Sequence, residues 1–529
     1  MSRDRRDRIS LLSNIVGYGR FAVGLGAFLR KPIPLSSVPD IVRRGMMRRE
    51  DAFLTKVERA IFANPRSPYL ALFRNAGCEL GDLQTLVRQV GVEAALERLR
   101  DAGVFVTFDE FKGRTPARRG SQTFAFRDSD FDNPLITAHF YGTSGGSRGT
   151  PSRIIIDLEH LSQMTPHWAL WLLANGVAAS PLIFVNPSYP SAISHPLMSV
   201  KFGNRYVKWF ITSGGGTVPY RLASAYLQTL TRWMARFPKP DRILPGETTK
   251  IGPYLCRLTA EGLSPCVNTS PSMATRIALA TQERGDSLRN VTFLLGAEPL
   301  TAARRRTIEA SGARATVTYG FSEGGNIGSQ CATPATTDDI HIALDTYAVI
   351  QRNRSLDEGR TGADVLLLTA LRPACPKVLM NTDIGDTAVL ETRSCGCMLD
   401  ELGYRRHLHT VRSSQKLTGE GVTFLGADIV HVLEEVLPRR FGGAITDYQL
   451  VEEQTTHGLP RYTLLASPEI GALDEDAVVA TFLAALGTLR RPYGVMVNQW
   501  RETNALHIKR TRPIPTARGK LLPFRTLGS

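Results

Sequence analysis

The stretch YGTSGGSRGTPSRIII, residues 141–156, gathers several kinds of residue that can bind anions. Its centre consists of hydroxyl residues, glycines and one arginine: Thr143, Ser144, Gly145, Gly146, Ser147, Arg148, Gly149 and Thr150. Glycines leave the backbone amides open to a ligand, while hydroxyls and a guanidinium donate hydrogen bonds to anionic oxygens. Such a segment can surround a polyphosphate, although it can also be a hairpin loop that binds nothing.

Two known motifs can be tested on the same segment. A P-loop needs a lysine directly after its last glycine, and no lysine stands there. The nucleophile-elbow pattern G-x-S-x-G fits residues 142–146 letter for letter, with Ser144 as the nucleophile. An elbow serine is followed at once by a helix, whereas Pro151 and the isoleucines at 154–156 predict a strand. The sequence therefore favours a phosphate-binding loop between two strands over a serine hydrolase.

Further segments follow this loop in a fixed order. They are LLGAEPL at 294–300, YGFSEGG at 319–325, LMNTDIGDTAVLE at 379–391, VRSSQKLTGEGVTFLGADI at 411–429 and PIPTARGKLLPF at 513–524. Together with TSGGSRGTP at 143–151, the ordered set resembles the adenylate-forming, acyl-CoA synthetase superfamily. Within it, the chain is most similar to the phenylacetate-CoA ligase and acyl-protein synthetase branch, over residues 65–524.

The resemblance implies a nucleotide site. The loop 143–150 would contact the β- and γ-phosphates of ATP, Tyr319 beside Gly320 would stack on adenine, and Ser322 would approach phosphate. Glu323 would bind the Mg²⁺ that bridges the phosphates, since a hard cation prefers a carboxylate. The segment lying against adenine would be Gly296, Ala297, Glu298 and Pro299.

The resemblance also implies a mobile C-terminal part. Asp386 would accept both ribose hydroxyls, Arg412 keeps its family position in the nucleotide site, and Lys520 would be the catalytic lysine. Ser414 and Gln415 stand where the family has paired aspartates at the hinge. Arg148 likewise stands where the family has threonine.

The activity implied is the activation of a carboxylic acid by ATP as an acyl-adenylate, followed by transfer to a thiol, foremost coenzyme A. Alternative acceptors are an acidic carrier protein, a protein cysteine or an amine, and a non-catalytic nucleotide-binding relative is a further alternative. Tyr189 and His195 are candidates for the acyl pocket, although both residue types are more often structural in such places. The acid can be aryl or aliphatic.

Four residues suggest a second metal besides Mg²⁺. Cys331 and His341 follow the YGFSEGG segment, and Cys395 and Cys397 follow the Asp386 segment. If these segments meet at the nucleotide, three thiolates and an imidazole could form a closed tetrahedral zinc site. Buried cysteines without a metal are the competing interpretation.

Composition limits the partners and the compartment. The net charge of +15 suits an anionic partner, but no nucleic-acid-binding pattern of basic and aromatic residues is present. Seven scattered cysteines are typical of a cytoplasmic protein. The apolar stretch within residues 1–31 is too short for a transmembrane segment, so we expect an arm that packs on the body, with weak membrane-surface contact as the alternative. The oligomeric state stays open.

The elements that must position these residues predict an α/β protein with a large multi-layer N-terminal body and a small mobile α+β lid. At 529 residues the chain is expected to form more than one domain. Short β-branched runs alternate with helical segments in the body, at 134–141, 153–157, 181–186, 290–296, 315–320 and 364–371. We expect the body at 1–411, including a helical arm at 1–64, and the lid at 412–529.

Overall fold

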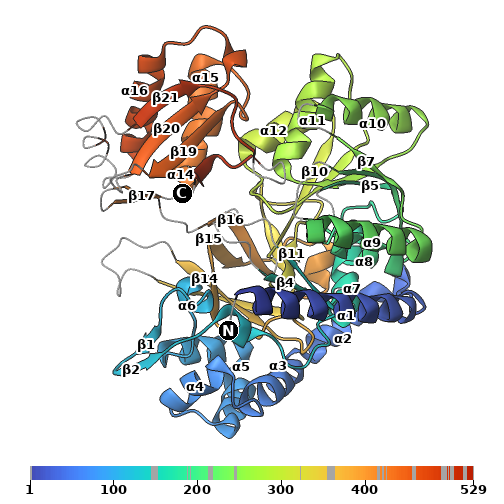
Figure 1. Ribbon diagram of the computed structural model, residues 1–529, viewed down its shortest axis with the longest axis vertical. Coiled ribbons are helices and arrows are strands. Elements are labelled where there is room, and N and C mark those ends of the chain that lie inside the picture. Colours follow the sequence, from blue (N-terminus) through green and yellow to red (C-terminus); the bar gives the residue numbers. More distant parts are fainter. Residues whose placement is uncertain are drawn as a thin grey trace.

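The computed structural model describes most of the chain. The described residues are 3–143, 153–186, 189–190, 192–211, 218–243, 247–321, 323–353, 364–413, 417–419, 422–424, 426–454, 460–489, 497, 500, 506–515 and 521–527. Figure 1 shows a large body and a smaller C-terminal unit beside it. Among the described residues, no helix combines the length and the apolar character that crossing a bilayer requires.

The N-terminal part is helical. Its helices are α1 (Arg3–Leu29), α2 (Val38–Met47), α3 (Arg49–Val57), α4 (Pro68–Asn75), α5 (Leu80–Asp101) and α6 (Phe108–Phe111). Helix α1 runs through its glycines and packs on the body through Phe21, Leu25 and Phe28. Gly17 permits this contact, because a Cβ there would lie 2.2 Å from the carbonyl oxygen of His139. Helix α5 breaks at Gly91, whose φ of 79° is not helical.

A central sheet forms the core of the body, and within the described residues it has 12 strands, in the order β13-β14-β15-β16-β12-β11-β10-β9-β8-β5-β6-β7. Its bounds are β5 (Leu182–Asn186), β6 (Tyr206–Ile211), β7 (Pro240–Arg242), β8 (Cys266–Thr269), β9 (Thr292–Leu295), β10 (Arg314–Phe321), β11 (Gly325–Ser329), β12 (Ile340–Ile342), β13 (Tyr347–Arg352), β14 (Val365–Ala370), β15 (Thr382–Thr392) and β16 (Arg406–Ser413). In this spatial order, all neighbouring pairs from β7 through β6, β5, β8 and β9 to β10 are parallel. All pairs from β10 through β11, β12, β16, β15 and β14 to β13 are antiparallel. Strand β10 therefore joins the two halves.

Helices cover both faces of the parallel half. They are α7 (Leu158–Ala174), α8 (Ser194–Lys201), α9 (Val218–Ala235), α10 (Ile251–Ala260), α11 (Pro271–Glu283) and α12 (Ala302–Ala310). Side chains alternate between the faces of a strand. Accordingly, Leu182 and Phe184 of β5 belong to one hydrophobic cluster, and Ile183 and Val185 belong to another. The continuous apolar run of β5 is thus explained by burial on both faces.

The C-terminal unit has its own core. Its sheet has the order β21-β20-β19-β22, with β19 (Tyr448–Gln454), β20 (Pro460–Ala466), β21 (Leu506–Arg510) and β22 (Phe524–Leu527). Helices α14 (Gly426–His431), α15 (Leu437–Phe441) and α16 (Glu475–Leu489) pack on it, and their apolar side chains form a cluster separate from those of the body. The predicted α/β body with an α+β lid is confirmed, while the boundary at 411/412 stays a prediction.

Most predicted strands of the body are present with small shifts. Residues 134–139 are an exception, because the strand expected at 134–141 begins only at Phe140. This strand, β3 (Phe140–Thr143), pairs antiparallel with β4 (Arg153–Ile156), and helix α7 begins only after β4. Strands therefore flank the glycine-rich segment on both sides, as the sequence predicted.

Candidate nucleotide site

Two of the predicted nucleotide-binding segments meet at the carboxyl ends of β9 and β10. These strands pair in parallel, with Leu295 opposite Val317, so the residues after β9 lie beside the end of β10. A Cβ on Gly296 would lie 3.3 Å from Cγ2 of Thr318, the residue before Tyr319. Ligands of open α/β sheets bind in the crevice beyond the carboxyl ends of the strands. The segment 296–299 and Tyr319 occupy such a place.

A third segment reaches the same place from the antiparallel half of the sheet. The hydroxyl of Tyr319 donates a hydrogen bond of 2.8 Å to Oδ2 of Asp386, which lies on β15. Asp386 pairs with Ser413 of β16, and Arg412 pairs with Thr387. The structure thus brings together the residues predicted to bind adenine and ribose, from segments that are 67 positions apart.

The side chain of Glu298 binds other residues of the protein. Its carboxylate is buried and accepts hydrogen bonds from the backbone nitrogen of Ser272, at 3.1 Å, and from its hydroxyl, at 2.9 Å. Nη1 of Arg304 lies 3.2 Å from the same carboxylate. Only the backbone of Glu298 is left for the predicted contact with adenine. Its neighbour Ala297 has a φ of 69°, which turns the chain sharply after β9.

Glu323 forms an ion pair that the sequence did not suggest. Its Oε1 lies 2.5 Å from Nζ of Lys112, which comes from the segment after α6, and both side chains are largely buried. Oδ1 of Asp128 lies 4.0 Å from the same ammonium group. A lysine therefore holds the carboxylate that is predicted to bind Mg²⁺.

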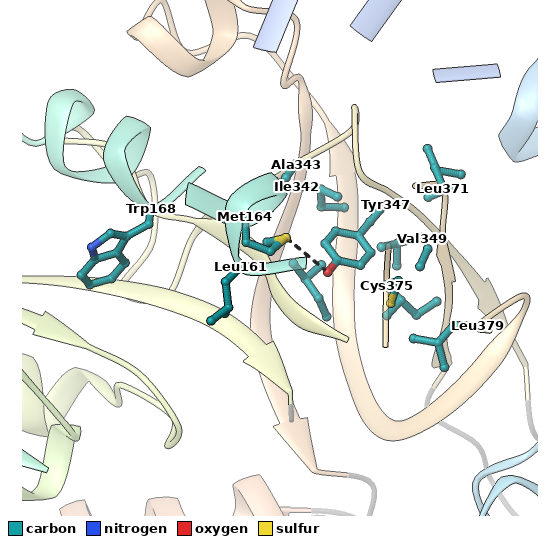
Figure 2. Packing of buried hydrophobic residues seen from close by; sticks show 14 of the residues in the cluster. Leu161, Met164, Trp168, Ile342, Ala343, Tyr347, Val349, Leu371, Cys375 and Leu379 are labelled. Carbon is teal, nitrogen blue, oxygen red and sulfur yellow. Dashed lines mark hydrogen bonds between the residues drawn. The ribbon is translucent and has the colours of Figure 1, made fainter. Parts of the chain in front are cut away.

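A buried tyrosine of the hydrophobic core contacts the turn after Glu323. Figure 2 shows Tyr347 of β13 with its hydroxyl directed at Met164 of α7, at 3.9 Å from the sulfur. The same hydroxyl donates a hydrogen bond to the carbonyl oxygen of Gly324. Gly325 has a φ of 92°, a conformation that favours glycine. These contacts fix the backbone on which Glu323 stands.

The two acyl-pocket candidates lie in an aromatic cluster. The ring of Tyr189 is fully buried and its centroid lies 4.5 Å from that of Trp209. His195 stacks on Trp168 at 4.5 Å, and burial lowers its pKa to about 4. The contacts of Tyr189 and His195 are thus those of packed residues, and their place in an acyl pocket stays a prediction.

Several predicted residues lie outside the described part of the chain. They are Ser144, Gly145, Gly146, Ser147, Arg148, Gly149, Thr150, Ser322, Ser414, Gln415 and Lys520, and the side chains of Thr143 and Arg412. Their roles stay predictions.

The predicted metal residues converge. One ligand atom from each of Cys331, His341, Cys395 and Cys397 lies within 4.8 Å of all the others. Nε2 of His341 is 3.5 Å from the sulfur atoms of both Cys395 and Cys397. Hydrogen bonding with Cys397 lowers the pKa of the Cys331 thiol to about 4. The four residues form a compact cluster.

Sequence reasoning missed side-chain partners that are far apart in the sequence. Lys112 is 211 positions from Glu323, and no motif surrounds it. Arg304 and Glu434 form a buried ion pair of 2.9 Å between α12 of the body and the helical turn Val432–Val436 of the lid.

No protein-family model matches the sequence, and no curated protein matches it. Two crystal structures of 2-hydroxyisobutyryl-CoA ligase in the postadenylation state, one in complex with 2-HIB-AMP, are similar to this chain. Each has a TM-score of 0.54 at 14% identity, covering 94% of this chain and 91% of the other. ATP-bound MatB from Rhodopseudomonas palustris has a TM-score of 0.43 at 13% identity, over 73% of this chain and 67% of its own.

This likeness extends over both the body and the C-terminal unit. The predicted assignment to the adenylate-forming superfamily is supported at the level of the fold, and the phenylacetate-CoA ligase branch stays a prediction. The chain has the fold of the adenylate-forming acyl-CoA ligases.

Proposed function

We propose that the protein activates a carboxylic acid with ATP and transfers the acyl group to a thiol, foremost that of coenzyme A. The observation that carries this proposal is the hydrogen bond between Tyr319 and Asp386, at the carboxyl end of β10. It joins the residue predicted to stack on adenine to the residue predicted to hold the ribose. The fold shared with 2-hydroxyisobutyryl-CoA ligase supports the same reaction class.

The first step needs little acid–base chemistry. A carboxylate oxygen of the acid bonds to the α-phosphorus of ATP, the bond to the bridging oxygen breaks, and pyrophosphate leaves. The carboxylate is already ionised at neutral pH, so the protein must position the reactants and offset negative charge. We assign the offsetting charge to Lys520, which would bridge the carboxylate and the phosphate as a point charge.

The residues present fit a magnesium ion. Glu323 offers the carboxylate oxygen that a hard divalent cation prefers, and it comes four residues after Tyr319, which is predicted to stack on adenine. When bound, Mg²⁺ neutralises charge on the phosphates. Glu323 is held in place by the turn at Gly324 and Gly325, and Lys112 contacts its Oε1.

In the second step, a thiolate attacks the acyl carbon of the adenylate. The bond between that carbon and the phosphate-bound oxygen breaks, so AMP leaves and a thioester forms, while the thiol proton passes to solvent. The +15 net charge is equally compatible with coenzyme A and with an acidic carrier protein, because both present negative charge.

Pyrophosphate release, measured over a panel of aryl and aliphatic acids with and without coenzyme A, tests the proposal. We expect acid-dependent release and a thioester when coenzyme A is present. Release without thioester formation would favour a carrier protein, protein cysteine or amine as the acceptor. No release with any acid would favour a binding protein, and ester cleavage without ATP would favour a hydrolase.

A further inference from the structure

We propose that Cys331, His341, Cys395 and Cys397 bind one zinc ion, which fastens the loop between β15 and β16 to the β11–β12 region. The four residues come from three places in the chain. Cys331 follows β11, His341 lies on β12, and the two other cysteines lie just before α13 (Met398–Glu401). This site is separate from the ATP and Mg²⁺ chemistry proposed above.

The distances suit a tetrahedral ion. Zinc binds thiolates at about 2.3 Å and imidazole nitrogen at about 2.0 Å, so neighbouring ligand atoms in a tetrahedron are roughly 3.5–3.8 Å apart. The sulfur atoms of Cys395 and Cys397 each lie 3.5 Å from Nε2 of His341. No pair among the four ligand atoms exceeds 4.8 Å, so small side-chain movements would complete the coordination.

The histidine is already oriented as a ligand. Nδ1 of His341 lies 2.7 Å from the carbonyl oxygen of Tyr404, so it carries the proton and donates to that oxygen. The lone pair of the neutral imidazole is then on Nε2, the atom that faces the two cysteines. A second hydrogen bond of this kind is the usual way in which proteins fix a metal-binding histidine.

The loop that holds the two cysteines is itself built around a carboxylate. Oδ2 of Asp400 accepts hydrogen bonds from the backbone nitrogens of Cys395, at 3.0 Å, and Gly396, at 2.9 Å, and from the hydroxyl of Ser394. Gly396 has a φ of 68°, which allows the chain to turn between the two cysteines. Both sulfur atoms are thereby directed toward His341.

The site is closed, so its role is structural. Cys331 and His341 are almost fully buried, and four protein ligands leave no position for a substrate. Strands β12 and β16 are joined by only two residue pairs, Ile340 with Leu408 and His341 with His407. A metal bridge at this point would reinforce the short contact between β12 and the hairpin of β15 and β16, which carries Asp386.

Metal analysis of the purified full-length protein tests the proposal without any activity measurement. We expect one zinc ion per chain in the wild type, and its loss in Cys397→Ser, which keeps the size of the side chain. Cys256→Ser is the matched control, because Cys256 is also half-buried but lies on α10, outside the cluster. A wild type that holds no stoichiometric zinc after loading under reducing conditions overturns the proposal, and so does full zinc content in Cys397→Ser.

Cobalt substitution of the wild type provides a second measurement that does not depend on how the variant folds. We expect thiolate-to-cobalt charge-transfer bands and the strong visible absorption of a tetrahedral site. A disulfide between two of these cysteines in freshly reduced protein, or weak octahedral cobalt bands, would contradict a zinc site. Because none of these readouts needs ATP or an acid, failure of the proposed ligase reaction would leave the zinc proposal intact.

Discussion

Nζ of Lys112 lies 2.5 Å from Oε1 of Glu323, so an ammonium group holds the carboxylate to which the magnesium role is assigned. The two side chains are only 14% and 10% exposed, which weakens the competition from water. A metal ion that approaches Glu323 must share or displace this lysine. Asp128, 4.0 Å from the same ammonium group, offers Lys112 a second partner.

We predict that Lys112→Met lowers the Mg²⁺ concentration needed for half-maximal acid-dependent pyrophosphate release. The expected change is roughly three- to tenfold, equivalent to about 1 kcal/mol, because the metal no longer competes with the ammonium group. Arg114→Met is the control, because Arg114 is two residues from Lys112 and its ion pair with Asp109 is exposed. A higher Mg²⁺ requirement in Lys112→Met would show instead that the lysine assists phosphate binding.

We predict that Tyr319→Phe raises the KM for ATP about fivefold and leaves kcat nearly unchanged. The ring is kept, but Asp386 loses a hydrogen bond of the kind that contributes about 1 kcal/mol. An interaction made equally in the ground state and the transition state changes KM alone. Steady-state kinetics with saturating acid measure this KM, and Tyr226→Phe, at an exposed position of α9, is the control. Equal KM values for the variant and the wild type would remove the pair from nucleotide binding.

The sequence predicts the layers of the fold better than the contacts that complete the site. Continuous apolar runs such as those of β5 and β14 identify buried strands, because burial on both faces leaves no polar positions. Gly91 breaks α5 although the apolar periodicity continues through it, because a single glycine is a weak signal until its φ is known.

Individual side-chain contacts are likewise predictable only where a motif marks the residue. Tyr319, Glu323 and Asp386 stand in ordered motifs, and the metal cluster is recognisable because cysteine and histidine are rare. Lys112 and Tyr347 have no such motif, since their partners are set by the tertiary fold alone. Sequence reasoning could therefore name candidate nucleotide residues but not the groups that contact them.

We predict that Lys520→Ala reduces pyrophosphate release at least roughly a hundredfold, since one group that stabilises transition-state charge is lost. ATP binding, measured by equilibrium titration, should be retained because Asp386 and the residues predicted to bind adenine and phosphate belong to the body. Lys509→Ala is the control, as this exposed lysine on β21 belongs to the same unit. Normal release by Lys520→Ala would exclude this lysine from the reaction.

The lid is attached to the body through a buried network of charges. Nη2 of Arg304 lies 2.9 Å from Oε1 of Glu434, and the hydroxyl of Thr301 donates a bond of 2.5 Å to its Oε2. Arg304 also pairs with Glu298, the residue that follows the turn at Ala297. The docking of the lid is therefore linked to the segment predicted to lie against adenine.

We predict that Glu434→Gln weakens this docking by about 1–3 kcal/mol, because the buried guanidinium of Arg304 loses one charged partner. Limited proteolysis should then release a C-terminal fragment faster than in the wild type. Glu435→Gln is the matched control, because its contact is 4.0 Å long and its partner Arg306 is exposed. Identical cleavage rates in the two variants would show that the ion pair does not hold the lid.

We predict that His160 makes the protein sensitive to mild acid. Burial lowers the pKa of this α7 histidine from 6.5 to about 4, so the folded state holds the ring neutral. In the unfolded chain the ring binds a proton already near pH 6.5. The stability that the neutral ring contributes is therefore fully present above about pH 6.5 and is lost as the pH falls toward 4, by on the order of 3 kcal/mol.

The side chain of His160 lies next to Gly325, since a Cβ there would be 3.1 Å from Nε2, so its protonation would disturb the turn that carries Glu323. His160→Gln, which does not titrate, should flatten the fall of the thermal midpoint between pH 6.5 and 4.5. His431→Gln is the control, because the His431 side chain is 46% exposed. If His160→Gln and the wild type lose stability equally over this range, the acid sensitivity has another source, such as His195, whose pKa burial also lowers to about 4.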